Sequence, residues 1–448
     1  MRNIRVARWG LLLLTTGLWL LADTLWPQPL SYFAFRGVFV QYSGVIAIGA
    51  MSISMLLSVR PVWLERTLNG LDKMYRLHKW LGIVALVSSL LHWWWAKGSK
   101  WMVGWGWLER PARGGPSGSA TQVASTLETW LSSQRGFAEE LGEKAFYIAL
   151  LLLVLALVKY FPYRLFIKTH KWLALAYLAL VYHTVVLTKM AYWRQPIGWV
   201  LALMLLAGTV SSLLVLFKRV GKSRQVSGSV AQVAYIPELK VTRTDIRLTP
   251  GWKGHRSGQF AFVSAFSDER AHPYTLSSAW DPKNPMVQFI TKALGDHTST
   301  LHERLKPGMP VTVEGPYGCF TFDDTPPRQI WVGGGIGITP FIARLKEIAQ
   351  RCEQAPNVDL FHCTTDYDPP TMALLQADAD AAGIRLHVLH TRNDGHLSGK
   401  NIRMAVPEWP NASIWFCGPA DFAQALRSDF NRHGFPMQHF HQELFAMR

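Results

Sequence analysis

Six long apolar stretches, separated by polar segments, occupy the first half of the chain. Each approaches the roughly 20 residues that a membrane-spanning helix needs, although the fourth and fifth reach that length only with their flanks. The pattern therefore predicts an all-α bundle of six transmembrane helices within residues 1–224. The expected spans are Trp9–Trp26, Val38–Val59, Leu77–Ala96, Ala145–Phe161, Trp172–Leu187 and Ile197–Phe217.

From about Gln225 onward the apolar runs shorten to strand length, with Gly and Pro between them. Residues 225–326 are expected to form short strands joined by turns, as in a small antiparallel β-barrel. In residues 327–448, strand-like runs alternate with a glycine loop and helical segments, which indicates an α/β domain with a parallel sheet. The predicted fold class is therefore multidomain, with the six-helix bundle followed by the β-barrel and the α/β domain.

Composition supports a membrane part, because only 17% of the residues are charged, against about 25% in soluble domains. The net charge of +16 would by itself allow a nucleic-acid partner. The basic residues, however, form short clusters beside the apolar runs, where they report membrane orientation. We therefore predict a multi-pass protein of the cell (inner) membrane that contacts the lipid bilayer and no nucleic acid, with both termini cytoplasmic. The clusters lie at residues 2–8, 60–79, 159–171 and 218–224.

The four cysteines all lie in the last third of the chain. Their spacing predicts no disulfide framework, no Cys-x-x-Cys metal site and no covalent haem attachment. Their position is typical of a C-terminal part kept in a reducing cytoplasm. The outer loop of residues 97–144 is bordered by tryptophans, which favours anchoring at the membrane surface and leaves any further role open.

Two of the predicted spans carry two histidines each, His78 and His92 in the third and His170 and His183 in the fifth. An ionisable group in hydrocarbon costs a few kcal/mol or more. A lone histidine would be interpreted as a hydrogen-bonded structural residue, whereas two pairs favour ligands. At 1.5 Å per residue, the two histidines of each helix lie about 20 Å apart. If the two helices are parallel neighbours, His78 faces His170 at one level and His92 faces His183 at the other.

Each level would then offer two imidazole nitrogens to a metal. Two such nitrogens suit a six-coordinate haem iron that passes single electrons, so we predict two haem b groups. Zinc is the alternative, but two histidines per level are too few for its tetrahedral shell. One difficulty concerns phase, because thirteen residues on an ideal helix leave His170 and His183 about 220° apart. The fifth helix would need a bulge or a tilt, or the haems would be approached from different sides.

Residues 272–279, with the sequence His-Pro-Tyr-Thr-Leu-Ser-Ser-Ala, place an aromatic ring, hydroxyls and a basic group on one strand edge. Tyr274 can stack on an isoalloxazine, and Thr275 can bond the ring or the ribitol. Ser277 and Ser278 can bond ribitol or phosphate. The segment therefore predicts a flavin site, although strand ends rich in Ser and Thr are common.

A second segment supports the same site. Lys292 supplies a positive charge, and Gly295 to Thr298 form a tight turn that opens a helix. A helix N-terminus attracts anions, here a flavin pyrophosphate. The alternative for Thr298 is a plain N-cap.

A glycine-rich loop, Gly333–Pro340, follows a predicted strand and opens a helix. Its glycines let a dinucleotide phosphate approach the backbone, and Pro340 suits the first helical turn. The spacing departs from the Rossmann fingerprint, but phosphate binding remains the better interpretation. Cys417, Gly418 and Pro419 follow another predicted strand, at the carboxyl end where open α/β sheets bind ligands. The alternative for Cys417 is packing.

Taken in this order, the motifs resemble those of the ferric reductase and NADPH oxidase superfamily over nearly the whole chain. The paired histidines resemble that family's two-haem bundle. Four further motifs resemble its ferredoxin reductase-type module of FAD and NAD(P) binding. They are His272–Thr275, Gly315–Gly318, Gly333–Pro340 and Cys417–Pro419.

The resemblance implies roles for individual residues. FAD would contact His272, Tyr274, Thr275 and Ser277. The NAD(P) phosphates would contact Gly334, Gly335, Gly337 and Thr339. Cys417 would lie by the nicotinamide, and Phe445 near the C-terminus would cover the flavin face as a gate. The alternative for Phe445 is a hydrophobic C-terminal anchor.

The sequence also departs from the family. Thr365 occupies a place where relatives often have an arginine for the NADPH 2′-phosphate, so the preference between NADPH and NADH stays open. No EF-hand loop is present in the sequence, so calcium control is not expected.

These observations predict an enzyme, an NAD(P)H-dependent transmembrane flavohaem reductase. A flavin accepts a hydride and releases single electrons, which two haems would carry to an acceptor outside. Ferric or other metal chelates are the first expectation, and oxygen, giving superoxide, is the second. Two alternatives remain: an electron-supply subunit for a redox partner protein or quinone, and a membrane-anchored flavin reductase whose histidines are structural.

Overall fold

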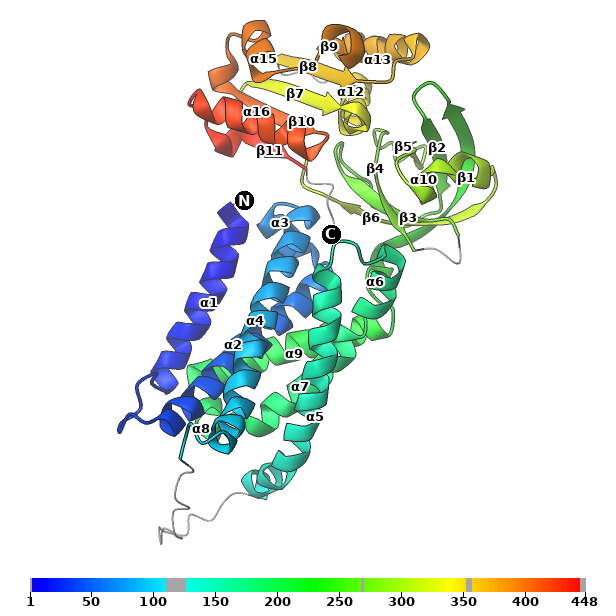
Figure 1. Ribbon diagram of the computed structural model, residues 1–448. Helices are drawn as coiled ribbons and strands as arrows, with labels where there is room; N and C mark the ends of the chain where they lie inside the picture. Colours follow the sequence, from blue (N-terminus) through cyan, green and yellow to red (C-terminus); the bar gives the residue numbers. More distant parts are fainter. Residues whose placement is uncertain (1, 110–125, 267–269, 352–356, 444–448) are drawn as a thin grey trace. The chain divides into compact units, whose positions relative to one another are not determined.

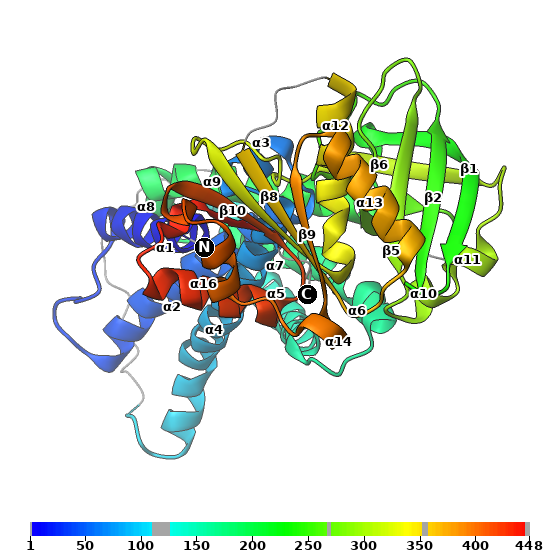
Figure 2. The ribbon, with the colours of Figure 1, turned by 90° about the horizontal axis from the view of Figure 1, so that it is seen from above.

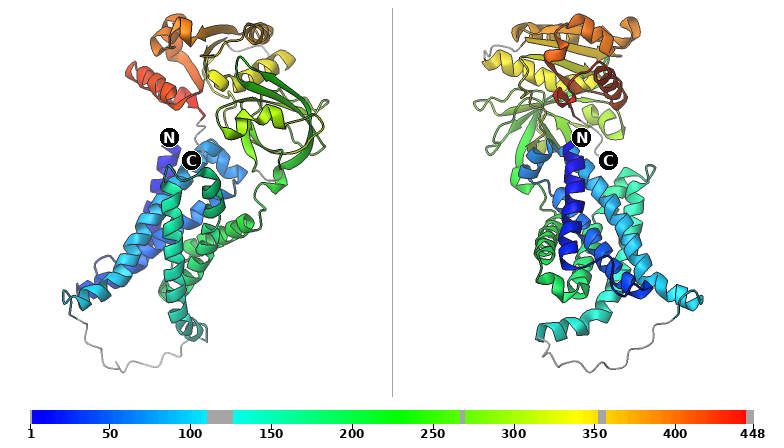
Figure 3. Two further views of the ribbon diagram at one scale, coloured as in Figure 1. Left: turned by 45° about the vertical axis from the view of Figure 1, so that its right-hand side comes forward. Right: turned by 90° about the vertical axis from the view of Figure 1, so that its left-hand side faces the viewer.

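The computed structural model describes residues 2–109, 126–266, 270–351 and 357–443. Two compact units divide the chain. The first is helical and comprises the residues up to 220, and the second comprises residues 221 onward together with residues 69–72. Figure 1 follows the elements of both units in chain order, and Figure 3 shows the same helices and strands from two further sides.

The first unit is a bundle of long helices joined by short ones. In it, α2 packs against α9 and α5 packs against α7. Small residues permit the close approach: a Cβ on Gly208 of α9 would lie only 2.1 Å from the Tyr177 hydroxyl of α7, as is usual where membrane helices pack tightly. The helices are α1 (Arg2–Ala22), α2 (Tyr32–Ser58), α3 (Val62–Leu68), α4 (Leu71–Gly104), α5 (Thr126–Leu157), α6 (Tyr163–His170), α7 (Leu173–Leu187), α8 (Met190–Trp193) and α9 (Pro196–Leu216).

The prediction of six apolar spans was wrong in number. Among the described residues, four helical segments are long and apolar enough to cross a membrane: Asn3–Ala22, Tyr32–Ser58, Leu165–Leu187 and Pro196–Leu216. The other two expected spans do lie in long helices, α4 and α5. Their apolarity is interrupted, because α4 carries serines, His92 and several tryptophans, and the apolar end of α5 is preceded by Glu140, Glu143 and Lys144.

The second unit contains two sheets. The first has six antiparallel strands in the order β4-β3-β6-β1-β2-β5. The expected closed barrel is not found, because β4 and β5 remain the edges and the contact between them is a single isolated bridge from Leu276 to Phe289. β4 has four residues and contains Pro273, which cannot donate to a ladder. The strands are β1 (Gln225–Ile236), β2 (Val241–Leu248), β3 (Phe260–Ser264), β4 (His272–Thr275), β5 (Met286–Lys292) and β6 (Pro310–Tyr317).

The second sheet has five parallel strands in the order β11-β10-β7-β8-β9. Helices cover both faces, with α12 and α13 on one and α15 and α16 on the other (Figure 2). Side chains alternate accordingly along β7, where Trp331 joins one core and Ile330 and Val332 join the other. The main elements are β7 (Arg328–Gly334), α12 (Thr339–Arg351), β8 (Asn357–Thr364), α13 (Pro369–Ala381), β9 (Arg385–His390), α15 (Gly399–Ala405), β10 (Ala412–Cys417), α16 (Ala420–Arg432) and β11 (Phe440–Gln442).

Short helices complete the second unit. α10 (Asp296–Ser299) and α11 (Leu301–Arg304) follow β5, and a 3₁₀ turn over Gly335–Ile338 joins β7 to α12. Asp368 begins α13 by accepting a hydrogen bond from the backbone N–H of Thr371 at 3.0 Å, with Pro369 in the first turn. The four strands predicted for the parallel sheet are therefore present as β7, β8, β9 and β10. The helices between them cover both faces of the sheet.

Leu345 of α12 tests this core. It is fully buried between α12 and the sheet, so Leu345→Ala should cost about 2–5 kcal/mol through lost burial and the cavity left behind. The measurement is the thermal unfolding of the purified full chain, followed by intrinsic fluorescence. Leu374→Ala on α13 is the matched control, because Leu374 is 67% exposed. Equal unfolding temperatures for the two variants would contradict the assignment of this core.

Candidate functional site

The four histidines of the helical unit meet in two pairs. The ring centres of His78 and His170 are 6.0 Å apart, and those of His92 and His183 are 6.2 Å apart. We call them the first and the second histidine pair. Within the described residues no group of three or more metal-ligating side chains occurs, so each level offers two imidazoles.

A break in the helix solves the phase difficulty of the sequence pattern. α6 ends at His170 and α7 begins at Leu173, with Lys171 and Trp172 between them. Because hydrogen bonds of the i→i−3 type tighten the chain at these two residues, the angle of a regular α-helix does not apply between His170 and His183. Both histidines can therefore point towards α4.

Backbone carbonyls orient three of the four rings. The Nδ1–H of His78 donates to Ser54 O at 2.9 Å, and that of His92 donates to Val40 O at 2.9 Å. The Nδ1–H of His183 donates to Ala138 O at 2.8 Å. This bond fixes the tautomer and leaves Nε2 as the ligand atom, as is usual for metal-binding histidines.

His170 differs from the other three. Its Nδ1 is buried and has no hydrogen-bond partner within the described part of the chain, and its ring packs on Phe166 with centres 4.8 Å apart. Packing alone therefore holds this ring.

Glycines make room for the second pair. A Cβ on Gly142 of α5 would lie 2.0 Å from Nδ1 of His183, and a Cβ on Gly44 of α2 would lie 3.2 Å from the His92 ring. No side chain other than glycine fits at residue 142 while His183 keeps its position.

A partly open pocket adjoins the first pair. Gly82 of α4 borders it, and a Cβ there would meet no atom within 4 Å, so open space faces the helix one turn from His78. The remaining lining is largely apolar. The residues are Met51, Ser54, Met55, Ser58, His78, Gly82, Ala85, Leu153, His170, Lys171, Leu173, Ala174, Tyr177 and Val215.

These residues fit a haem. A metal ion binds an imidazole nitrogen at about 2.0–2.1 Å, and the ring centre lies about 1.2 Å beyond it, so two imidazoles on opposite sides of one ion have centres roughly 6.4–6.6 Å apart. Both observed separations are close to this value. An apolar pocket beside a pair of this spacing suits a flat macrocycle held by axial nitrogens.

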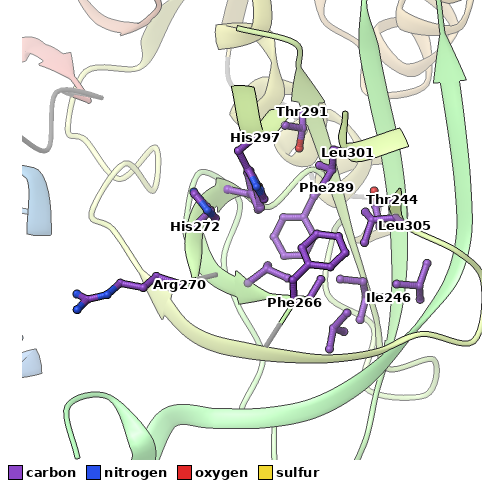
Figure 4. Close-up of a pocket in the computed structure, with 15 residues that line it drawn as sticks. Thr244, Ile246, Phe266, Arg270, His272, Phe289, Thr291, His297, Leu301 and Leu305 are labelled. Atoms are coloured by element: carbon purple, nitrogen blue, oxygen red, sulfur yellow. The ribbon is translucent and has the colours of Figure 1, made fainter. Parts of the chain in front are cut away.

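In the second unit, the predicted flavin segment is held by aromatic contacts. The ring of His272 stacks on His297 with centres 3.8 Å apart, and the Tyr274 hydroxyl shares a 2.8 Å hydrogen bond with Nε2 of His297. Figure 4 shows His272 and His297 side by side at one end of a cavity within the sheet, with Phe289 inside it and Arg270 directed away. Sequence reasoning missed His297, although it lies inside the quoted turn.

The two predicted serines have partners within the protein. Ser277 is fully buried, and its hydroxyl donates to Gln288 Oε1 at 3.2 Å. The hydroxyl of Ser278 accepts from the backbone N–H of Gln288 at 3.1 Å. Thr275 ends β4 opposite Phe260 of β3. Gln288 lies at the start of the second predicted segment but was given no role, and its hydrogen bonds to the two serines identify it.

The predicted pyrophosphate turn is short. α10 is a single turn, and the Thr298 hydroxyl accepts hydrogen bonds from the backbone N–H groups of Leu294 and Gly295 at 3.0 and 3.2 Å. The N-cap of α10 is Gly295, so Thr298 is not the N-cap that was its alternative but the third helical residue, whose hydroxyl caps the backbone N–H of Gly295. Lys292 forms an ion pair with Asp366, with Nζ and Oδ2 2.7 Å apart, and this ion pair lowers the pKa of Asp366.

The two nucleotide motifs meet at one point of the parallel sheet. The chain runs outward from β7 to β9 and then returns to β10 on the other side of β7, which is the switch point where such sheets bind ligands. A Cβ on Gly337 would lie 2.1 Å from Cys417 O, and one on Gly334 would lie 2.9 Å from Pro419. The glycines thus allow the two loops to touch.

The remaining residues of these loops are placed nearby. Gly335 adopts a φ of +56°, which favours glycine. The Thr339 hydroxyl donates to Ile336 O at 2.7 Å at the start of α12. Phe445, the predicted gate, lies outside the described residues.

Cys417 is fully buried at the end of β10. Burial raises the pKa of its thiol well above the usual range, and the carboxylate of Glu443 adds to that effect. Burial also raises the pKa of Cys363 to about 12. Both groups are therefore neutral thiols at neutral pH.

Comparison with known proteins supports the two-part organisation. Residues 43–181 match the family described as "Ferric reductase like transmembrane component". The NADPH oxidoreductase of Mycobacterium tuberculosis is 30% identical over 208 residues, which cover 44% of this chain and 54% of that protein. The glycine betaine monooxygenase reductase subunit of Chromohalobacter salexigens is 29% identical over 211 residues, covering 43% and 56%. The chain thus spans about half the length of these relatives.

Two further similarities are weaker. Ferric reduction oxidase 5 of Arabidopsis thaliana is 31% identical over 116 residues, covering 24% of this chain and 16% of that protein. Among solved structures, the flavohemoglobin of Malassezia yamatoensis aligns with a TM-score of 0.47 and 14% identity, covering 92% of this chain and 97% of that one. With a TM-score below 0.5, the second similarity adds nothing to the assignment.

Residues 43–181 thus resemble the transmembrane component of ferric reductases, and just under half of the chain is similar to proteins named as an NADPH oxidoreductase and a monooxygenase reductase subunit. These similarities agree with the resemblance to the ferric reductase and NADPH oxidase superfamily that the sequence motifs carry.

The thiol of Cys417 gives a test of the switch-point geometry. Because alkylating reagents react with thiolates, the buried Cys417 should react slowly in the native protein between about pH 7 and 9 and rapidly after unfolding. Iodoacetamide labelling followed by mass spectrometry measures this, with the partly exposed Cys319 as the internal control. Fast native labelling of Cys417 would contradict its burial.

Proposed function

We propose that this chain is a transmembrane flavohaem reductase that passes electrons from cytoplasmic NAD(P)H to an acceptor on the outer face, ferric or other metal chelates first. The observation that carries the proposal is the pair of imidazole–imidazole distances, 6.0 and 6.2 Å, on two levels of one helical bundle. An ionisable residue within a membrane is functional by default, and two matched pairs suit two haems better than a structural role.

The proposed membrane unit extends over residues 1–224. His78 with His170, and His92 with His183, would each hold one b-type haem through Nε2, and the haem iron would supply one-electron transfer. Ser54, Val40 and Ala138 would keep three of the rings in the ligating tautomer through their carbonyls. The basic clusters of the sequence favour cytoplasmic termini in a cell membrane.

In the reductase module, residues 225–326 would bind FAD and residues 327–448 would bind NAD(P)H. FAD would supply the conversion of a hydride into single electrons. Tyr274 and Thr275 would contact its ring, with His272, Ser277, Ser278, Lys292, Gly295 and Thr298 around the rest. Gly334, Gly335, Gly337, Thr339, Gly418 and Pro419 would surround the nucleotide phosphates at the switch point, and Cys417 and Phe445 would lie beside the nicotinamide.

A second candidate is an electron-supply protein for a redox partner or a quinone. Relatives named as reductase subunits of monooxygenases favour it. A superoxide-generating oxidase is the third. NAD(P)H consumption by the purified protein separates the three, because it should depend on ferric chelate, on an added partner or quinone, or on oxygen alone.

A redox difference spectrum of purified membranes tests the haems. We expect a low-spin b-type signal that falls in both His92→Ala and His170→Ala, because each variant removes one axial ligand from a different level. Flavin content, measured on the same samples, should be unchanged. A full haem signal in both variants would refute the proposal.

Gly142→Ala tests the second level without touching a ligand. The added methyl would overlap the His183 ring, so we expect about half of the haem signal to be lost, since one of the two proposed haems loses a ligand. Gly136→Ala on the same helix is the control, because a Cβ there would meet nothing within 4 Å. An unchanged spectrum of Gly142→Ala would show that His183 does not bind a haem in this position.

A further inference from the structure

The flavin-type sheet and the nucleotide-type sheet are joined by a polar contact that none of the predicted motifs contains. Lys346 of α12 reaches the side chain of Gln288 on β5, with Nζ 3.1 Å from Oε1. α12 directly follows the glycine loop in the sequence, and β5 lies beside the segment Tyr274–Ser278, to which the bridge between Leu276 and Phe289 connects it. The contact therefore links an element next to one predicted ligand site with an element next to the other.

Gln288 is fixed at every polar atom that it offers. Its Oε1 accepts from Lys346 and from the Ser277 hydroxyl, and its Nε2 donates to Asp245 Oδ1 at 2.7 Å. Its backbone N–H donates to Ser278 Oγ, and its carbonyl accepts from the backbone N–H of Ser277 at 2.8 Å. A shift of α12 is therefore transmitted to the two serines that follow Tyr274 and Thr275.

Lys346 is not an ordinary surface lysine. It is partly buried, and burial lowers the pKa of its ammonium, partly offset by the nearby Asp378 and Asp245. A desolvated ammonium needs an oriented acceptor, and Gln288 Oε1 is the one acceptor within hydrogen-bond distance found among the described residues.

The surroundings show that this contact is part of a packed boundary. On one side Lys292 pairs with Asp366 across the two sheets. An apolar cluster also crosses the boundary, where residues of β1, β2, β5 and the turn between β1 and β2 meet residues of the glycine loop, α13 and β9. Its members are Ile236, Leu239, Val241, Ile290, Ile336, Met372 and Val388. Apolar packing holds the sheets together but is tolerant of sliding, whereas a hydrogen bond to a fixed carboxamide sets direction.

We propose that Lys346 is a positioning residue for hydride transfer: through Gln288 it sets the orientation of the glycine loop and α12 relative to Tyr274–Ser278. The proposal rests on the proposed function, since it assumes that NAD(P)H binds at the switch point and FAD at the segment after β4. Hydride transfer requires the two reacting carbons to be held at near contact. The residue touches neither reacting group and acts through Gln288.

The test compares Lys346→Met with Lys346→Arg in the purified full-length protein loaded with FAD. Anaerobic stopped-flow measurement follows a single turnover of NAD(P)H oxidation over a range of nucleotide concentrations. We expect Lys346→Met to lower the limiting rate about tenfold, since small misplacements have effects of this size or larger, with less than a twofold change in the nucleotide concentration for half-saturation. Lys346→Arg should recover most of the rate, because it keeps a cation donor.

Two further measurements separate positioning from folding. Lys400→Met, at an exposed position on α15, is the control and should keep the wild-type rate. Flavin content and unfolding temperature of Lys346→Met should stay close to wild type, and the primary isotope effect with deuterated nicotinamide should rise, because the hydride step becomes more limiting. A merely structural lysine would lower flavin content instead.

The partner is tested by a double-mutant cycle. Gln288→Met alone and together with Lys346→Met should give the same slow rate within about twofold, since the two residues act in one path. Multiplicative effects of the two substitutions, or a wild-type rate in Lys346→Met, would overturn the proposal. Failure of the proposed function itself would look different, because the unaltered protein would then not oxidise NAD(P)H in a single turnover at all.

Discussion

The structure depends on the cost of placing imidazoles inside an apolar bundle. A polar ring among helices is tolerated when each nitrogen has a partner. Carbonyls satisfy Nδ1 of His78, His92 and His183, whereas Nδ1 of His170 has no hydrogen-bond partner among the described residues. Helix packing follows from this requirement, because α5 can supply the carbonyl of Ala138 only where Gly142 allows the His183 ring to approach.

The sequence was informative about which residues matter in the helical unit and less so about how they are held. Spacing alone predicted that His78 would face His170 and that His92 would face His183, and the rings lie at these levels. It could not place the break at Lys171 and Trp172, because no proline or glycine marks it. The overestimate of apolar spans has a different cause, since α4 and α5 are long helices whose apolar runs are interrupted or preceded by polar residues.

In the second unit, local signals predicted strands and loops well, and long-range pairing poorly. The glycine loop and Cys417 could be matched because both follow parallel strands, whose carboxyl ends share one edge. The closed barrel was wrong, since closure depends on pairing between β4 and β5 that their own residues do not encode. Sequence reasoning assigned no role to three residues whose partners are distant in the sequence. The pairs are His297 with Tyr274, Gln288 with Lys346, and Asp366 with Lys292.

In the proposed function the two units solve different physical problems, and this would explain why their chemistry is built differently. Transfer of single electrons tolerates distance and needs mainly fixed carriers, so a rigid bundle with paired rings and little polar surface is sufficient. Hydride transfer occurs only at near contact, so the reductase module needs directional contacts between its sheets. The carboxamide of Gln288 donates to Asp245 and accepts from Lys346, so in the proposal it sets the orientation of the two sheets. The apolar cluster that contains Val241 and Met372 holds the sheets together without orienting them.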